Sequence, residues 1–223
     1  MHSETSRLTS RPAFALVLGS GGIRSAASLG VAKVLWREGF IPDVVAGCSA
    51  GAIFGAALCH LNDPEQAKEV ATELWTREIT QRRRRGAIAR MLWPRLGRFD
   101  ADFSLRDKGE IQERLHRAFG PIRFADLAIE LRVRATDAQS GQPCTLKDGG
   151  VVDALLASIA MPFLFSPQIV AGRRYVDGFS SDPLPVSAAQ DVIATLAVGF
   201  GAPMPERVDT PARLLARTTS SMI

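Results

Sequence analysis

The chain has 223 residues, 46% hydrophobic and 22% charged, a globular composition that excludes a disordered or coiled-coil chain. This length suits one domain whose core needs no disulfides, and three cysteines cannot build a disulfide framework. The net charge is +4, and only four of the 27 basic residues are lysines, so the many arginines favour an anionic partner, either a nucleic acid or a membrane surface.

The first 12 residues are polar and predict a flexible N-terminal tail. The following apolar run, 13–18, is too short for a signal peptide and is followed by glycines. The longest apolar stretch, 44–59, is interrupted by glycines and falls short of a membrane span. These features predict a cytoplasmic protein without a transmembrane helix, either soluble or peripheral at a membrane.

The first half of the chain alternates between short apolar runs and helical patterns. The expected order is a buried strand (13–18), a glycine loop (19–22), a helix (24–38), a second buried strand (44–46), a sharp turn (47–51) and an apolar helix (50–61). Strand, loop, helix, strand, turn, helix is α/β order, and it implies a parallel sheet.

The second half of the chain predicts further helices and strands around a basic insertion at about 77–106. Helices are expected from 63 towards 80, over 107–119 and over 151–159. Strands are expected over 129–135 with one solvent-exposed face, at 144–146, in a hairpin over 169–176, and as a final buried strand over 192–198. The expected domain therefore covers 13–200, and residues 201–223 form a C-terminal tail or short helix.

A glycine-flanked serine lies between the second apolar strand and its helix. The sequence from Gly47 to Gly51 has the G-x-S-x-G pattern, in the strand–turn–helix context where this pattern forms a nucleophile elbow. The two glycines permit a strained turn and close packing. Ser49 would stand at a helix N-terminus, where N–H groups stabilise negative charge. The pattern favours a nucleophilic serine over an ordinary helix cap.

A serine nucleophile needs a base, and the three histidines are poorly placed. His2 lies in the tail, and His116 lies on a polar helix that favours a surface position. His60 is about 15 Å from Ser49 along one helix at 1.5 Å per residue. An aspartate must therefore be considered. Asp177 stands in an Asp-Gly turn, a weak signal by itself that gains weight only beside Ser49.

The glycine-rich loop over 19–24 has the sequence GSGGIR and lies between a strand and a helix. Its N–H groups could bind an anion. A dinucleotide loop would need G-x-G-x-x-G and an acid ending the second strand, and a P-loop would need Gly-Lys-Ser/Thr; neither pattern is present. An oxyanion hole beside the elbow is the better interpretation.

Four sequence blocks occur in an order that resembles the patatin-like phospholipase family, in a bacterial-type, single-domain form. They are the loop with a basic residue (19–24), G-x-S-x-G (47–51), A-S-x-x-x-P (157–162) and D-G at Asp177-Gly178. The resemblance covers about residues 13–200. The chain differs from the family pattern at three positions, Ser20, Ser25 and Phe179.

The resemblance implies a three-layer α/β sandwich with a mostly parallel central sheet and a nucleophile elbow. It implies a lipolytic acyl-ester hydrolase, similar to phospholipase A or lysophospholipase, that needs no cofactor and no metal. Ser49 would be the nucleophile and Asp177 the base. Gly21 and Gly22 would supply oxyanion N–H groups, and Arg24 would order that loop or support its charge. An acyltransferase or thioesterase for carrier-bound acyl groups, or a silent lipid-binding scaffold, remain alternatives.

The segment 77–98 contains eight arginines, including Arg82, Arg83, Arg84 and Arg85, interleaved with apolar residues such as Trp93. One interpretation is a solvated basic face or inserted loop. The other is a cap facing an anionic membrane surface, with arginines on lipid phosphates and apolar side chains in the interface. Nucleic-acid binding is not expected, because no aromatic stacking face or recognisable fold accompanies the charge.

Overall fold

The computed structural model describes residues 13–74 and 103–201. The predicted N-terminal tail, the arginine-rich segment with Arg82–Arg85 and Trp93, and the C-terminal segment beyond 201 lie outside the described residues. The predictions made for these segments therefore stay predictions.

Two sets of elements make up the described chain. The strands are β1 (Phe14–Leu18), β2 (Val44–Cys48), β3 (Glu130–Asp137), β4 (Pro143–Leu146), β5 (Gln168–Val170), β6 (Arg173–Asp177) and β7 (Ala194–Val198). The α-helices are α1 (Ala27–Arg37), α2 (Ala50–Leu61), α3 (Pro64–Leu74), α6 (Gly109–Phe119) and α7 (Val151–Ser158), and the short 3₁₀ helices include η1 (Gly22–Ala26), η4 (Gly178–Ser180) and η5 (Val186–Ala189). The predicted α/β order is confirmed.

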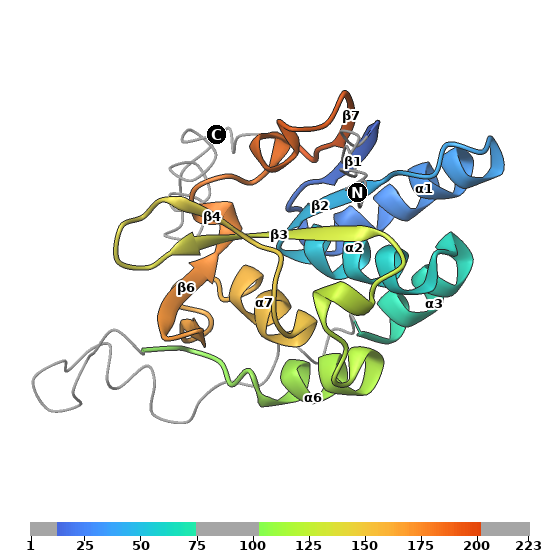
Figure 1. Cartoon of the computed structure of the whole chain (residues 1–223). Coiled ribbons are helices and arrows are strands. Elements are labelled where there is room, and N and C mark those ends of the chain that lie inside the picture. The colour runs from blue at the N-terminus through green and yellow to red at the C-terminus, as the bar shows by residue number, and fades with distance from the viewer. Residues whose placement is uncertain (1–12, 75–102, 202–223) are drawn as a thin grey trace, which may run out of the picture.

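The strands form one central sheet in the order β5-β6-β3-β2-β1-β7, with β4 paired to β3. The four strands β3, β2, β1 and β7 are parallel, while β4 and β6 run antiparallel to β3. Figure 1 shows α2, α6 and α7 below the strands as drawn, and β7 beside β1 at the far edge. The prediction of a mostly parallel central sheet is confirmed.

The register of β3 explains how distant parts of the chain meet. Residues 133 and 134 of β3 pair with both β2 and β4, so these two strands lie on opposite edges of β3. Residues 135 and 136 pair with both β4 and β6, so β6 lies on the same edge of β3 as β2, but further towards the C-terminal end of β3. Cys48 pairs with Arg134 and Asp177 pairs with Ala135. The end of β6 therefore meets the end of β2.

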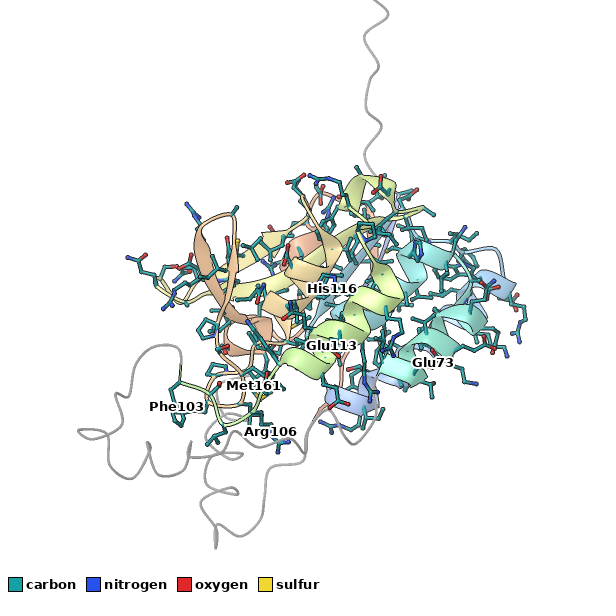
Figure 2. The ribbon with its side chains drawn as sticks, turned by 90° about the horizontal axis from the view of Figure 1, so that it is seen from below. Glu73, Phe103, Arg106, Glu113, His116 and Met161 are labelled. Atoms are coloured by element: carbon teal, nitrogen blue, oxygen red, sulfur yellow. The ribbon has the colours of Figure 1, made fainter. Side chains whose placement is uncertain are left out.

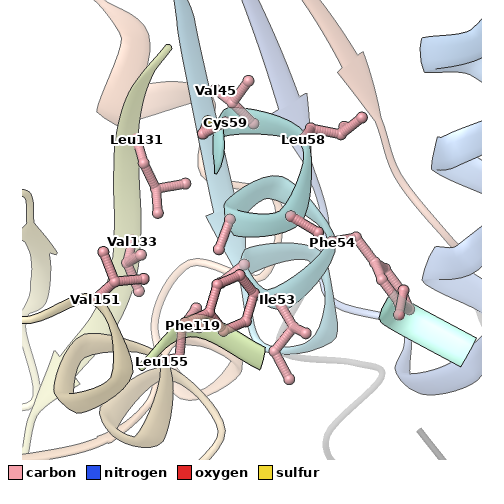
Figure 3. Packing of buried hydrophobic residues seen from close by; sticks show 14 of the residues in the cluster. Val45, Ile53, Phe54, Leu58, Cys59, Phe119, Leu131, Val133, Val151 and Leu155 are labelled. Atoms are coloured by element: carbon pink, nitrogen blue, oxygen red, sulfur yellow. The ribbon is translucent and has the colours of Figure 1, made fainter. Parts of the chain in front are cut away.

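Alternating side chains divide the core between the two faces of the sheet, as the two-residue period of a strand requires. Leu16, Leu18 and Val45 pack with the helices in the main cluster, which includes Phe54 of α2 and Phe119 of α6 (Figure 3). Ala15, Val17, Val44 and Ala46 face the other way and pack against Ala188, Ala189 and Val192. The segment around η5 thus forms the layer over the second face.

The prediction that one face of the 129–135 strand is exposed to solvent is wrong. Arg132 and Arg134 are buried on the face of β3 opposite Leu131 and Val133. Arg132 forms ion pairs with Glu130 and Asp191, and Arg134 pairs with Asp182. The segment from Asp182 to Asp191 covers this face and supplies carboxylates that compensate the two guanidinium charges.

The final strand is also less buried than the sequence predicts. Residues 194–197 of β7 are exposed and Val198 is half-buried. The reason is its place in the sheet, since β7 pairs with β1 at the end of the strand order. An apolar run alone does not distinguish a central strand from an edge strand.

Across the two described stretches, the structure has no helix both long and apolar enough to span a bilayer.

Candidate active site

Ser49 stands in a strained turn between β2 and α2. Its φ of 55° and ψ of −124° lie in a region that non-glycine residues rarely adopt. The flanking glycines are needed because the backbones approach closely. A Cβ at Gly47 would lie 2.5 Å from the Cα of Ala52, and one at Gly51 would lie 2.4 Å from the carbonyl oxygen of Leu18. The predicted elbow is therefore present in the fold.

Ser49 and Asp177 lie together at the junction of β2 and β6. The hydroxyl of Ser49 donates a hydrogen bond to Oδ2 of Asp177 at 2.9 Å, across 128 residues of chain. The backbone N–H of Phe179 donates to the other oxygen, Oδ1, at 2.9 Å. Both carboxylate oxygens are thus held, and one of them points at the serine hydroxyl.

Burial changes the protonation of this carboxyl group. Asp177 is 1% exposed, and burial raises its pKa to about 7, although the N–H of Phe179 and the hydroxyl of Ser49 act in the opposite direction. A carboxylate with a pKa near neutrality is a stronger base than a solvent-exposed aspartate and is still substantially ionised at pH 7. The arrangement suits proton abstraction from Ser49.

Ser158, the serine of the A-S-x-x-x-P block, anchors the backbone of the elbow by hydrogen bonds. Its hydroxyl accepts a hydrogen bond from the backbone N–H of Ser49 at 2.8 Å and donates to the carbonyl of Arg134 at 2.7 Å. Ser158 is fully buried. One side chain at the end of α7 therefore connects the strained residue of the elbow to β3.

The backbone on either side of Asp177 is also fixed. The N–H of Asp177 donates to the carbonyl of Ala160 at 3.0 Å, and the hydroxyl of Thr136 donates to the carbonyl of Asp177 at 3.0 Å. A Cβ at Gly178 would lie 2.5 Å from the carbonyl oxygen of Arg134, so the D-G pair needs its glycine for close approach.

The glycine loop follows β1, beside the elbow. Gly51 lies against the end of this strand, with its ideal Cβ 2.6 Å from the carbonyl oxygen of Gly19. Gly22 begins the 3₁₀ helix η1 and has a φ of +58°. The first N–H groups of a helix have no partner within it, as applies to Gly22 in η1 and to Ala50 in α2. The N–H of Ala50 therefore lies at the elbow itself, and the glycine loop lies beside the elbow through the close approach of Gly51 to Gly19.

Arg24 bonds this loop to another part of the fold, and Ser25 forms a hydrogen bond back to the start of the loop. The exposed side chain of Arg24 donates from Nη1 to the carbonyl of Gly201 at 3.2 Å, which joins the loop to the segment after β7. The hydroxyl of Ser25 donates to the carbonyl of Gly19 at 3.1 Å. Neither Ser20 nor Ser25 has a positive φ, so neither departure from the family pattern strains the loop.

Other nucleophiles and bases are unsuitably placed. Cys48 is buried, and burial raises the pKa of its thiol well above the ordinary value, so it does not form a reactive thiolate. His60 packs edge-on against Phe119, with ring centroids 6.4 Å apart. His116 is exposed on α6, on the underside of the molecule (Figure 2). His60 lies on the predicted apolar helix, and the predicted surface position of His116 is confirmed.

The contacts of Ser158 and Thr136 were not predicted from the sequence. The A-S-x-x-x-P block contains Ser158, so the motif itself was the available signal, but a motif does not say which atom its serine contacts. Thr136 lies in a strand of apolar and basic residues and carries no motif.

Comparisons with known proteins agree with the four sequence blocks. The sequence model described as patatin-like phospholipase matches residues 16–189. An uncharacterized NTE family protein of Mycobacterium tuberculosis is 33% identical over 192 residues, which cover 86% of this chain and 49% of the relative. Neuropathy target esterase of Drosophila melanogaster is 28% identical over 204 residues, which cover 87% of this chain and 14% of the relative.

The chain thus spans about half the length of the mycobacterial relatives it matches and a much smaller part of the insect proteins. Among solved structures, VipD of Legionella pneumophila aligns with a TM-score of 0.48 at 17% identity, over 75% of this chain and 46% of that one.

Proposed function

The chain belongs to the patatin-like phospholipase family, and we propose on this basis that it hydrolyses acyl esters of lipids with a Ser49–Asp177 dyad, in the manner of a phospholipase A or lysophospholipase. The observation that carries the proposal is the 2.9 Å hydrogen bond from the Ser49 hydroxyl to a buried carboxylate whose pKa is near 7. The name of the Drosophila relative, an esterase, agrees with this reaction class.

In the first step, Oγ of Ser49 attacks the ester carbonyl while Oδ2 of Asp177 accepts its proton. The carbonyl π bond opens, and its electron pair becomes the oxyanion of a tetrahedral intermediate. The N–H groups of Gly21 and Gly22, together with the N–H of Ala50 at the start of α2, would donate hydrogen bonds to this oxyanion.

Collapse of the intermediate expels the alcohol part of the lipid as an alkoxide, which takes the proton from Asp177. An aspartate base suits an ester, because an alkoxide needs less help to leave than an amine does. In the second step Asp177 accepts a proton from water, the resulting hydroxide attacks the acyl-serine, and the proton returns to Ser49 as the fatty acid leaves.

The test of the proposal is release of fatty acid from mixed phospholipids by purified protein, together with labelling by a fluorophosphonate probe. The expected result is one free fatty acid for each lysolipid formed, or two for each fully deacylated glycerophosphodiester, and covalent labelling of Ser49. A protein that is not labelled would be a lipid-binding scaffold. Labelling with acyl transfer to an added thiol or alcohol, but not to water, would identify an acyltransferase.

Replacing Ser158 with alanine should lower kcat by about 10- to 100-fold with little change in KM. The variant leaves the N–H of Ser49 and the carbonyl of Arg134 buried without this partner, which costs about 1–3 kcal/mol for each lost buried bond. The elbow then relaxes from its strained backbone, but no contact with substrate is lost. Steady-state kinetics with a short-chain ester and a thermal melt measure both effects.

Ser28→Ala is the matched control, because Ser28 is also fully buried and its hydroxyl donates to the backbone carbonyl of Ser25. Equal losses of kcat in the two variants, at equal losses of stability, would mean that Ser158 only supports the fold.

The basic segment should attract anionic membranes. Each basic residue near such a surface contributes on the order of 1 kcal/mol, so changing Arg82, Arg83, Arg84 and Arg85 together to glutamine should weaken binding to anionic vesicles at least about tenfold. Hydrolysis of a small soluble ester should stay unchanged. Vesicle co-sedimentation and soluble-ester turnover of the same variant decide this. Unchanged vesicle binding would favour a solvated basic face, and collapse of both readouts would mean that the segment shapes the site.

A further inference from the structure

The segment that leaves β7 lies against the glycine loop that leaves β1. The two strands are parallel and pair along their whole length, with Leu18 opposite Val198 at their C-terminal ends (Figure 1). The N–H of Gly19 donates to the carbonyl of Val198 at 2.9 Å, which extends this contact by one residue. Residues 199–201 and the glycine loop therefore begin side by side.

The ring of Phe200 is in close contact with Gly21. A Cβ at Gly21 would lie 2.9 Å from Cδ2 and 3.1 Å from Cγ of Phe200, and 2.8 Å from the hydroxyl oxygen of Ser25. A side chain at position 21 would therefore collide with both neighbours. The φ of Gly21 is −179°, an extended value, so it is the close approach of the ring that requires glycine here.

The residues on either side of Phe200 hold its ring in this position. A Cβ at Gly199 would lie 3.1 Å from Cδ2 of Leu184, so the backbone before the ring packs on that side chain. After the ring, the carbonyl of Gly201 accepts the hydrogen bond from Nη1 of Arg24 at 3.2 Å. Phe200 itself is half-buried. Moving the ring away from the glycine loop would disturb these contacts.

The glycine loop needs such support, because its own residues provide little. Glycine has no side chain and the widest backbone freedom, so ordering it is costly in entropy. The N–H groups of Gly19 and Ser20 donate to backbone carbonyls of late segments of the chain, but no described residue accepts the N–H of Gly21 or Gly22. The direction of these two N–H groups therefore depends on packing, and the ring of Phe200 is packed directly on Gly21.

We infer that Phe200 is a positioning residue for the oxyanion hole, because its ring fixes the peptide groups whose N–H groups would bind the oxyanion. The inference rests on the proposed function, since it concerns the donors of the same site. Phe200 acts through Gly21 and takes no part in proton transfer. Its loss should therefore weaken stabilisation of the oxyanion and leave the base unchanged.

Replacing Phe200 with alanine should lower kcat for p-nitrophenyl butyrate about 10- to 100-fold with little change in KM. Loss of one oxyanion donor costs about 10²- to 10³-fold in rate, and a loop that is misaligned for part of the time loses part of that. Phe200→Leu keeps an apolar contact with Gly21 and should recover most of kcat. Steady-state kinetics of the two variants measure this difference.

Phe14→Ala is the matched control. Phe14 is also half-buried, and it pairs with Ala194 at the opposite end of the same two strands, about 13 Å from Leu18 at 3.3 Å per residue. We expect Phe14→Ala to lower the melting temperature and to keep kcat. Equal losses of kcat in Phe14→Ala and Phe200→Ala, at equal losses of stability, would mean that Phe200 only supports the fold.

A thionoester separates the oxyanion hole from the base. Sulfur is a weak hydrogen-bond acceptor, so aligned N–H groups favour p-nitrophenyl butyrate over p-nitrophenyl thionobutyrate. Phe200→Ala should lower the ratio of the two kcat/KM values about tenfold. The pH–rate profile should keep its apparent pKa near 7, because Asp177 is untouched. An unchanged ratio, or a shifted apparent pKa, would overturn the inference.

The contact can also be measured without turnover. In protein labelled with ¹⁵N-glycine, an aromatic ring shifts the signals of nearby amides, so the assigned signals of Gly21 and Gly22 should move in Phe200→Ala and stay in Phe14→Ala. A wild-type protein that hydrolyses no ester but shows these shifts would refute the proposed function and leave the positioning of the loop standing. Ester hydrolysis with unmoved signals in Phe200→Ala would refute the inference alone.

Discussion

Replacing Ser49 with alanine is expected to reduce ester hydrolysis by on the order of 10⁴-fold or more while the protein stays folded. The reason is that the variant removes the hydroxyl that donates to the buried carboxylate of Asp177. The strained backbone at position 49 is retained, since alanine meets the same φ restriction as serine. Hydrolysis of p-nitrophenyl butyrate, fluorophosphonate labelling and a thermal melt measure the outcome.

Cys48→Ala is the control for this variant. Cys48 is the neighbouring nucleophile, but its thiol is buried and its raised pKa keeps it protonated. We therefore expect Cys48→Ala to retain most of the activity. Normal turnover by a folded Ser49→Ala protein would refute the dyad, and loss of turnover in Cys48→Ala would point to the thiol instead.

Asp177→Asn is expected to be nearly as damaging, with a loss of about 10³- to 10⁴-fold. The amide can still accept the N–H of Phe179 and can donate to the oxygen of Ser49, so the local structure should be preserved. It has no lone pair basic enough to take the proton of Ser49. Kinetics with a short-chain ester, compared with a thermal melt, separate lost chemistry from lost structure.

The raised pKa of Asp177 also predicts how the stability of the protein depends on pH. In the folded protein the pKa is about 7, against an ordinary value of 3.8, so between these two pH values the folded state holds a proton that the unfolded state releases. Stability therefore falls as pH rises from about 4 to 7, by at most about 4 kcal/mol at about 1.4 kcal/mol per unit.

Since asparagine carries no charge, Asp177→Asn should be more stable than the wild type at pH 8 and similar to it at pH 4. Activity of the wild type should rise with pH through an apparent pKa near 7, as the carboxylate forms. Chemical denaturation at both pH values and a pH–rate profile test these signs. The stability difference between Asp177→Asn and the wild type should favour the variant more at pH 8 than at pH 4. The opposite trend would contradict the raised pKa of Asp177.

Two histidine variants complete the comparison. His60 packs against Phe119, and His116 is exposed on α6, so neither touches Ser49 in the described structure. We expect His60→Ala and His116→Ala to stay active. An inactive but folded His116→Ala, together with an active Asp177→Asn, would show that the base is misassigned.

The elements around the elbow could be predicted from the sequence because local patterns determine them. The apolar runs at 13–18 and 44–46 predict β1 and β2, and the helical period that follows the second run predicts α2. The pairing of Ser49 with Asp177 could not be derived locally, because 128 residues separate them. It could be anticipated only from the resemblance of four ordered blocks to a known family.

The buried arginines show what the sequence could not reveal. The alternation of Arg132 and Arg134 with apolar residues is typical of a strand with one solvated face, and that interpretation was wrong because Asp182 and Asp191 cover the charges from another segment. The conformation of Phe163 was likewise unpredictable, because an aromatic residue carries no local preference for a left-handed backbone. Both features arise from contacts between distant parts of the chain.

The pairing of β7 with β1 affects when the candidate site can form during translation. The loop carrying Gly21 and Gly22 follows β1, yet the N–H of Gly19 is bound by Val198 and the N–H of Ser20 by Pro183. The proposed base also comes late, at position 177. A ribosome that has translated the elbow has therefore not yet supplied the partners that complete the site, and topologies with such distant pairings fold slowly. Nascent chains that stop before residue 177 would carry Ser49 without the proposed base, so the proposed dyad can form only after β6 has been translated.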